Sequence, residues 1–129
     1  MKFIFSILIL CQVLVACRKG PGIGGNAVIS GRVYEYNYNS DFTSIKDEYF
    51  IGNQEVFIVY GDNIVYDDKF KTHYDGTFEF TYLLPGKYTI YTYSKDRTGN
   101  SSIPVVVQKK VHISDQWDNI NTDTLIIYK

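Results

Sequence analysis

The chain has 129 residues, a length typical of one domain, and its formal charge at neutral pH is −1. This near-neutral balance of 13 basic and 14 acidic residues argues against nucleic acid as a partner. We find neither a repeat at solenoid periods nor coiled-coil heptads, so those architectures are also excluded.

Residues Met1 to Ala16 have the composition of an export signal. Lys2 gives a positive start, and an apolar run from Phe3 to Val13 follows, interrupted only by Ser6 and Gln12. A membrane-spanning helix needs about 20 apolar residues, and this run is shorter. We therefore predict that residues 1–16 are a signal peptide outside the folded domain.

The signal ends in Leu14-Val15-Ala16-Cys17, which resembles the lipobox of bacterial lipoproteins. The resemblance implies cleavage before Cys17, lipidation of its thiol and acylation of the new amino group. The mature chain would then have 129 − 16 = 113 residues. Cys11 would leave with the signal, so no disulfide is expected in the domain. The alternative is an ordinary secretory signal followed by a chance cysteine.

Residues 17–26 are predicted to be the lipidated cysteine and a flexible, Gly-rich tether. The nine residues after Cys17 would reach about 30 Å when fully extended. In some lipoprotein sorting systems an Asp directly after the cysteine signals retention at the inner membrane, and here that residue is Arg18. We therefore expect a lipid anchor in the cell envelope, at the outer membrane if the host has one. The periplasmic or surface side stays open.

From Ala27 to Lys129 the sequence predicts strands and no helix of any length. The expected fold is all-β, a single antiparallel β-sandwich of about seven to eight strands in one domain, 27–129. The expected strands are Ala27–Tyr36, Gln54–Gly61 as a central strand, one or two in Ile64–Tyr66 and Lys69–Tyr74, two around Pro85-Gly86, Ile103–Ser114 and Asp123–Lys129. Asn37–Asn53 is expected to be an irregular insertion, Lys95–Ser102 a loop and Asp115–Thr122 a turn.

The stretch from Thr72 to Ser94 carries the clearest strand signal. Phe78, Phe80 and Tyr82 alternate with polar residues, as the buried side of a half-buried strand requires. Tyr88 and Ile90 alternate in the same way after the Pro85-Gly86 turn. Asp75-Gly76 and Pro85-Gly86 place glycine where β-turns demand positive φ.

This pattern resembles the carboxypeptidase regulatory-like domains, a transthyretin-like (prealbumin-like) β-sandwich family. The residues that carry the resemblance are Val28, Gly31, Val33, Val56–Tyr60, Asp75-Gly76-x-Phe78-x-Phe80, Leu83 and Pro85-Gly86-x-Tyr88-x-Ile90. The match covers most of Val28 to Ser94. It implies a prealbumin-like fold and a role that is mainly structural or adhesive.

Residues for catalysis or metal binding are scarce. His73 and His112 have no ligand-like spacing, and no cysteine is left to bind zinc with them. The acidic residues Asp62, Asp67, Asp68 and Asp75 are best explained as solvated turn residues, and the serines lie in no nucleophile motif. We predict no enzyme activity, catalytic residue, metal or cofactor.

The aromatic residues are the remaining candidates for a binding surface: 12 Tyr, 8 Phe and 1 Trp. Tyr34, Tyr36 and Tyr38 should share one strand face, and Tyr91 and Tyr93 should face away from Tyr88 and Ile90. Exposed tyrosines can stack on sugars or dock proteins, and the alternative is ordinary cross-strand pairing. Trp117 is expected to plug the core, with an exposed ligand platform as the alternative.

The sequence thus predicts a non-catalytic, lipid-anchored envelope domain that acts as a protein-interaction or assembly module. The alternative is a carbohydrate-binding accessory lipoprotein that uses the exposed tyrosines. The partners expected are the membrane, through the N-terminal lipid, and an envelope protein or glycan.

Overall fold

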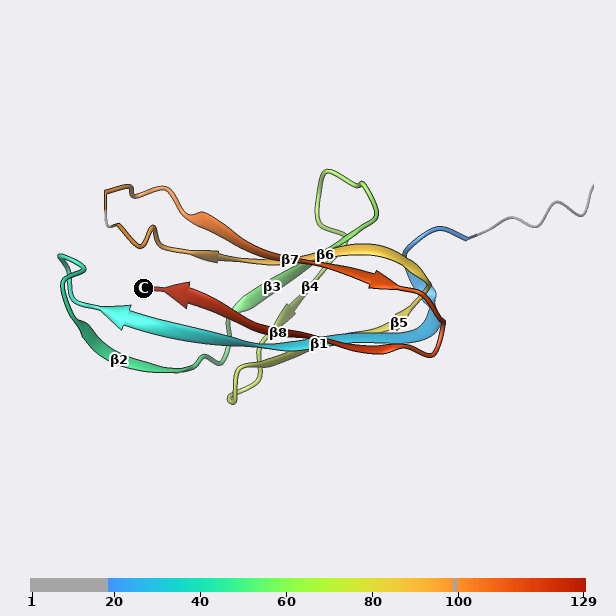
Figure 1. Cartoon of the computed structure of the whole chain (residues 1–129), viewed down its shortest axis with the longest axis horizontal. Helices are drawn as coiled ribbons and strands as arrows, with labels where there is room; N and C mark the ends of the chain where they lie inside the picture. The colour runs from blue at the N-terminus through green and yellow to red at the C-terminus, as the bar shows by residue number, and fades with distance from the viewer. Residues whose placement is uncertain (1–18, 99) are drawn as a thin grey trace, which may run out of the picture.

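A computed structural model describes residues 19–98 and 100–129 of the chain. Within these residues the chain forms eight strands in two sheets and no helix, so the predicted all-β sandwich is confirmed. Figure 1 shows β6 and β7 of one sheet above β1 and β8 of the other. The first sheet contains β1 (Ile23–Tyr38), β2 (Ile45–Phe50), β5 (Thr77–Leu83) and β8 (Asn119–Tyr128); the second contains β3 (Glu55–Tyr60), β4 (Asp68–Lys71), β6 (Gly86–Ser94) and β7 (Val105–Ile113).

The long strand β1 organises the first sheet. β5 pairs with the first half of β1, and β2 pairs with its last residues. β8 pairs with β1 from Val28 to Tyr36, a range that includes residues of β1 paired with β5 and residues paired with β2. Because a strand has two edges, β2 and β5 must share one edge of β1 and β8 takes the other. The β1–β8 pair is parallel, and every other strand pair that the structure describes is antiparallel.

The core lies between the two sheets and comes from the alternate, inward residues of both. Gly31 sits at a crowded point: a Cβ there would lie 2.4 Å from Thr122 Oγ1 and 2.7 Å from Phe78 Cζ. β3 is the predicted central strand, between β4 and β6, and three consecutive residues of it are buried. The fully or nearly fully buried hydrophobic residues include Ala27, Ile29, Val33, Val56, Ile58, Phe78, Phe80, Leu83, Tyr88, Ile90, Ile113, Leu125 and Ile127.

The alternation in β5 breaks one residue before its end. Phe78 and Phe80 are buried as predicted, but Tyr82 is 70% exposed and the prediction that it shares their face is wrong. Tyr82 has φ +58, which turns the backbone and brings Leu83 into the core in its place. Pairing with β1 is irregular at the same point, where Ile23 and Ala27 both oppose Leu83.

Three predicted boundaries are also wrong. β1 begins at Ile23, so the sheet takes in four residues assigned to the flexible tether. β2 forms inside the stretch predicted to be irregular. Its sequence, IKDEYF, has no apolar alternation, and every residue of the strand except Phe50 is exposed. β8 begins at Asn119, inside the predicted turn.

The strand registers define two ends of the sandwich. Gly86 pairs with Ile113, Tyr60 with Tyr88, and the amide of Val28 donates to Asp118 O at 2.9 Å. We call this the entry end, because the first described residues also join the domain there (Figure 1). It carries the β3–β4 loop (61–67), the β5–β6 turn (84–85) and the β7–β8 loop (114–118). The distal end carries the β1–β2 loop, the β6–β7 loop and the C-terminus.

Candidate binding site

The three tyrosines of β1 lie on the outer face of the first sheet and form a ladder of rings with Tyr128 of β8. The ring centroids of Tyr34 and Tyr36 are 5.3 Å apart, edge to face, and Tyr36 stacks on Tyr128 at 5.9 Å. Tyr38 lies 6.0 Å from Tyr128. Each ring partly covers its neighbour, so all four are half-buried rather than free.

Two further rings extend this surface. Phe50 of β2 lies edge-on to Tyr34 at 4.9 Å, and Phe42 stacks on Tyr38 at 5.4 Å. The Arg32 guanidinium covers Phe50, 3.3 Å from the ring centroid. Burial raises the pKa of the Tyr34 phenol, and the Glu48 carboxylate raises it further. We call the six rings Tyr34, Tyr36, Tyr38, Phe42, Phe50 and Tyr128 the tyrosine ladder.

A second aromatic cluster lies on the outer face of the second sheet. Phe57 of β3 is buried beneath Tyr66, Tyr91 and Tyr93, at centroid distances of 4.9, 5.0 and 5.7 Å. Tyr91 and Tyr93 meet edge to face at 5.7 Å. Burial and the neighbouring Tyr93 raise the pKa of Tyr91. Cross-strand aromatic pairing accounts for these contacts, and the ring of Tyr93 keeps an exposed side.

The structure therefore divides the tyrosines singled out in the sequence between opposite faces of the sandwich. Tyr34, Tyr36 and Tyr38 lie together, Tyr91 and Tyr93 lie together, and the two groups belong to different sheets. Trp117 lies apart from both, in the β7–β8 loop of the entry end. Its side chain is 70% exposed, so the prediction that it plugs the core is wrong.

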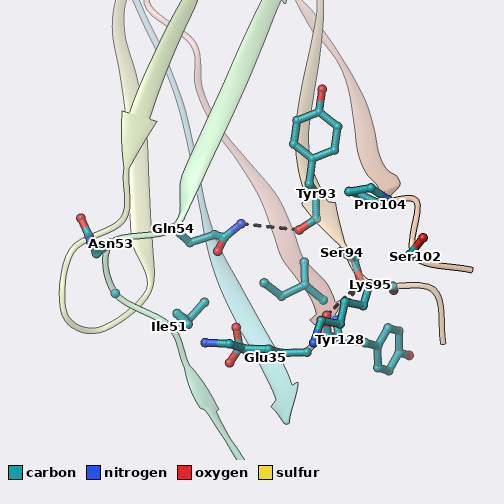
Figure 2. A pocket seen from close by; sticks show the side chains of 13 residues that line it. Glu35, Ile51, Asn53, Gln54, Tyr93, Ser94, Lys95, Ser102, Pro104 and Tyr128 are labelled. Carbon is teal, nitrogen blue, oxygen red and sulfur yellow. Dashed lines mark hydrogen bonds between the residues drawn. The ribbon is translucent and has the colours of Figure 1, made fainter. Parts of the chain in front are cut away.

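A hollow of about 440 Å³ at the distal end connects the two groups (Figure 2). Tyr93 of the second aromatic cluster and Tyr128 of the tyrosine ladder both line it. Each sheet therefore contributes one tyrosine to the lining of the hollow, and Figure 2 shows the two rings directed away from each other. The polar residues that line the hollow include Glu35, Asn53, Gln54, Ser94 and Lys95.

Glu35 is the residue in this hollow that the sequence interpretation missed. It occupies an inward position of β1, where it is only 2% exposed, and its Oε1 accepts a hydrogen bond from Tyr49 Oη at 3.0 Å. That bond raises the pKa of the Tyr49 phenol. An acidic residue at an inward position of an otherwise apolar alternation was the available signal, because a buried carboxylate needs a polar partner.

Hydrogen bonds hold the other polar groups in place. Gln54 Nε2 donates to Thr92 Oγ1 at 2.9 Å and Thr92 Oγ1 donates to the carbonyl of Glu55 at 2.7 Å. Ser94 Oγ accepts from the amide of Tyr128 at 2.8 Å, which ties the rim of one sheet to the other. Figure 2 shows Gln54 reaching toward Tyr93, and the Nε2 to Tyr93 O distance is 3.5 Å.

The hollow can bind a polar ligand with apolar faces. Its lining contains two tyrosines, the apolar residues Ile51, Pro104 and Ile127, and both donors and acceptors. Among residues 19–98 and 100–129, no group of three His, Cys, Asp or Glu side chains is placed to hold a metal ion. The same part of the chain contains no helix long and apolar enough to cross a membrane.

Comparisons with known proteins assign no family to the chain. No family model matches it, and no curated protein matches it. A solved structure from Pseudomonas aeruginosa, described as a "putative carbohydrate binding protein", has 16% identity and a TM-score of 0.48, and the match covers 84% of this chain and 91% of that one. A 9R-lipoxygenase from Cyanothece has 15% identity and a TM-score of 0.37, with 95% of this chain matching 20% of the lipoxygenase. Likenesses this distant carry no argument about function.

Proposed function

We propose that this chain is a non-catalytic binding module of the cell envelope, anchored by lipid on Cys17, and that it binds carbohydrate at the distal hollow. The observation that carries the proposal is that Tyr93 and Tyr128 line one hollow together with Glu35 and Gln54. Sugar rings have apolar faces that stack on aromatic side chains, and hydroxyls that pair with carboxylate and amide groups. The hollow offers both kinds of group.

The lipid anchor is supported by the Leu14–Cys17 motif and by the preceding apolar run. Metabolic labelling with a fatty-acid analogue tests it directly. Label should enter the wild-type chain and be lost on Cys17→Ala. Incorporation that survives Cys17→Ala would exclude this cysteine as the anchor.

Carbohydrate binding is tested with the purified protein on an array of envelope oligosaccharides, including peptidoglycan fragments and O-polysaccharides. We expect Tyr93→Ala and Tyr128→Ala each to weaken retention about tenfold, the equivalent of about 1.4 kcal/mol. Tyr82→Ala is the matched control, because Tyr82 is exposed at the entry end, far from the hollow. Equal retention of all three variants and the wild type would exclude the hollow as the site.

A protein partner is the second candidate, favoured by the continuity of the tyrosine ladder over three strands and a loop. Tyrosine is enriched at protein interfaces because it has an apolar body and a polar tip. Cross-linking in intact cells, followed by affinity capture, tests this candidate. A discrete partner recovered with the wild type and lost on Tyr34→Ala would establish it, while recovery of the chain alone would favour carbohydrate.

A further inference from the structure

The first described residues are fixed to the entry end of the sandwich. The amide of Gly22 is buried and donates to the hydroxyl of Tyr88 at 2.9 Å. Pro21 packs so closely on the β5–β6 turn that a Cβ on Gly86 would lie 2.5 Å from its Cγ. Five residue steps separate Gly22 from Cys17, which is about 18 Å at full extension. A lipid on Cys17 would therefore hold the entry end near the bilayer.

Two loops at this end expose large apolar side chains. Ile64 is 100% exposed and Val65 is also largely exposed, both in the β3–β4 loop, and Trp117 is exposed in the β7–β8 loop. Figure 1 shows the first described residues leaving between these two loops. Trp is the side chain most suited to a membrane–water interface, since its ring is apolar and its N–H is a donor.

Hydrogen bonds hold both loops in these positions. Asp67 accepts from the amide of Tyr60 at 2.7 Å and from Asn63 Nδ2 at 3.0 Å. In the other loop, the amide of Trp117 donates to Asp115 Oδ1 at 2.9 Å. Asp118 Oδ2 accepts from the amides of residues 114 and 115, both at 3.0 Å. The apolar tips are thus presented by ordered loops and do not fold back onto the core.

The charged groups near the β3–β4 loop carry both signs, since Asp62, Asp67 and Asp68 lie in or directly after the loop. Lys87, Lys110 and His112 line a hollow of about 450 Å³ on the outer face of the second sheet, and Asp62 is the acidic residue there. Lys19 precedes the fixed residues and is exposed. The carboxylates of Asp67, Asp115 and Asp118 are engaged with groups of their own loops. Lys87 and Lys110 can pair with anionic head groups at a lipid surface.

We infer that the entry end rests in the lipid–water interface, with Trp117 and the Ile64-Val65 tip in contact with lipid and the distal hollow facing away from it. The inference rests on the proposed anchor at Cys17. A lipidated domain with a long tether would need no such contact, whereas the fixed Pro21-Gly22 segment brings this end to the bilayer. The distal hollow then stays open to ligand.

The experiment uses the fact that Trp117 is the only tryptophan of the chain. The full-length lipidated protein is reconstituted into phosphatidylethanolamine–phosphatidylglycerol vesicles, with or without lipids brominated near the head group. We expect Trp117 emission to fall at least twofold in the brominated vesicles. Ile64→Trp in a Trp117→Phe background should show similar quenching.

The matched control is Ile103→Trp in the same background, because Ile103 is 73% exposed but lies in the β6–β7 loop at the distal end. Its emission should be unchanged by bromine. An intact mass on each preparation shows whether the chain is acylated. Acylated protein with unquenched Trp117, or with equal quenching at 103 and 117, would overturn this inference alone. If the protein isolated from cells never shows the added mass of acyl chains, both the proposed anchor and this inference would be overturned.

Discussion

The hydroxyl of Tyr88 accepts a hydrogen bond from the amide of Gly22, 66 residues earlier in the chain, at 2.9 Å. The same hydroxyl donates to the carbonyl of Leu84 at 2.6 Å. One buried phenol therefore joins the entry of the first sheet to the β5–β6 turn, where the chain passes from the first sheet to the second. Burial raises the pKa of this phenol, and its bonds to Gly22 and Leu84 act in the opposite direction.

Removing this hydroxyl should destabilise the domain. Tyr88→Phe keeps the ring in the core but leaves the Gly22 N–H and the Leu84 carbonyl without this partner. We expect a loss of about 1–3 kcal/mol in the free energy of unfolding, measured by urea denaturation. Tyr74→Phe is the control, since Tyr74 is exposed and the change should have no effect. Equal midpoints for the two variants would refute a structural role for the bond.

Gly86 should tolerate no side chain. Its φ is +149, outside the type II turn value of about +80 that the Pro-Gly sequence suggested, but still a conformation that disfavours other residues. Gly86→Val should cost roughly 1–3 kcal/mol in backbone strain and more through its clash with Pro21. Pro21→Gly should recover the part due to the clash. Gly20→Ala is the control, because nothing lies within 4 Å of that position.

Phe80 and Tyr82 test the break in the alternation of β5. Phe80→Ala removes a buried ring and should cost about 3–5 kcal/mol in the free energy of unfolding. Tyr82→Ala should cost far less, because most of that ring faces solvent. Thermal denaturation of the two variants is the measurement. If the Tyr82 variant proved as unstable as the Phe80 variant, Tyr82 would have to be buried, and the alternation predicted from the sequence would hold to the end of β5.

The sequence predicted those elements whose strands bury one face. β5 and β6 were found because Phe78, Phe80, Tyr88 and Ile90 alternate at period 2 and glycine marks the turns. β2 was missed because an exposed edge strand buries almost nothing and so has no alternation. The positive φ of Tyr82 could not be predicted either, because a tyrosine side chain gives no signal for that backbone conformation.

The candidate site was predictable only in part. The tyrosines of β1 were expected on one face, and they lie there with Tyr128, which sequence spacing could not associate with them. That contact depends on the parallel β1–β8 register. The distal hollow depends on how the two sheets end relative to each other, which is a tertiary property. Trp117 was expected to plug the core, yet its side chain is exposed and its loop is held by hydrogen bonds to Asp115 and Asp118.

A local motif that recurs three times should make stability depend on pH. In each case an Asp accepts a bond from the hydroxyl of the Thr two residues later, at 2.7, 2.7 and 2.6 Å. The pairs are Asp41–Thr43, Asp75–Thr77 and Asp96–Thr98. The Thr hydroxyl bond is the leading cause that lowers the pKa of each Asp, and the Thr amide adds to it. The folded state thus favours the ionised carboxylate.

Thr77→Val tests this motif at the turn before β5, because valine keeps the shape of threonine without its hydroxyl. Since the pKa of Asp75 is lowered on folding, its contribution to stability is present above the unfolded pKa, near 3.9, and is lost as pH falls through the lower folded pKa. The wild type should therefore be more stable than Thr77→Val near neutral pH, and the difference should shrink between about pH 5 and pH 2. Urea denaturation across this range is the measurement. Thr77→Ser retains the hydroxyl and should follow the wild-type pH profile; a pH-independent difference for Thr77→Val would mean that the lost hydroxyl acts through packing and not through the charge of Asp75.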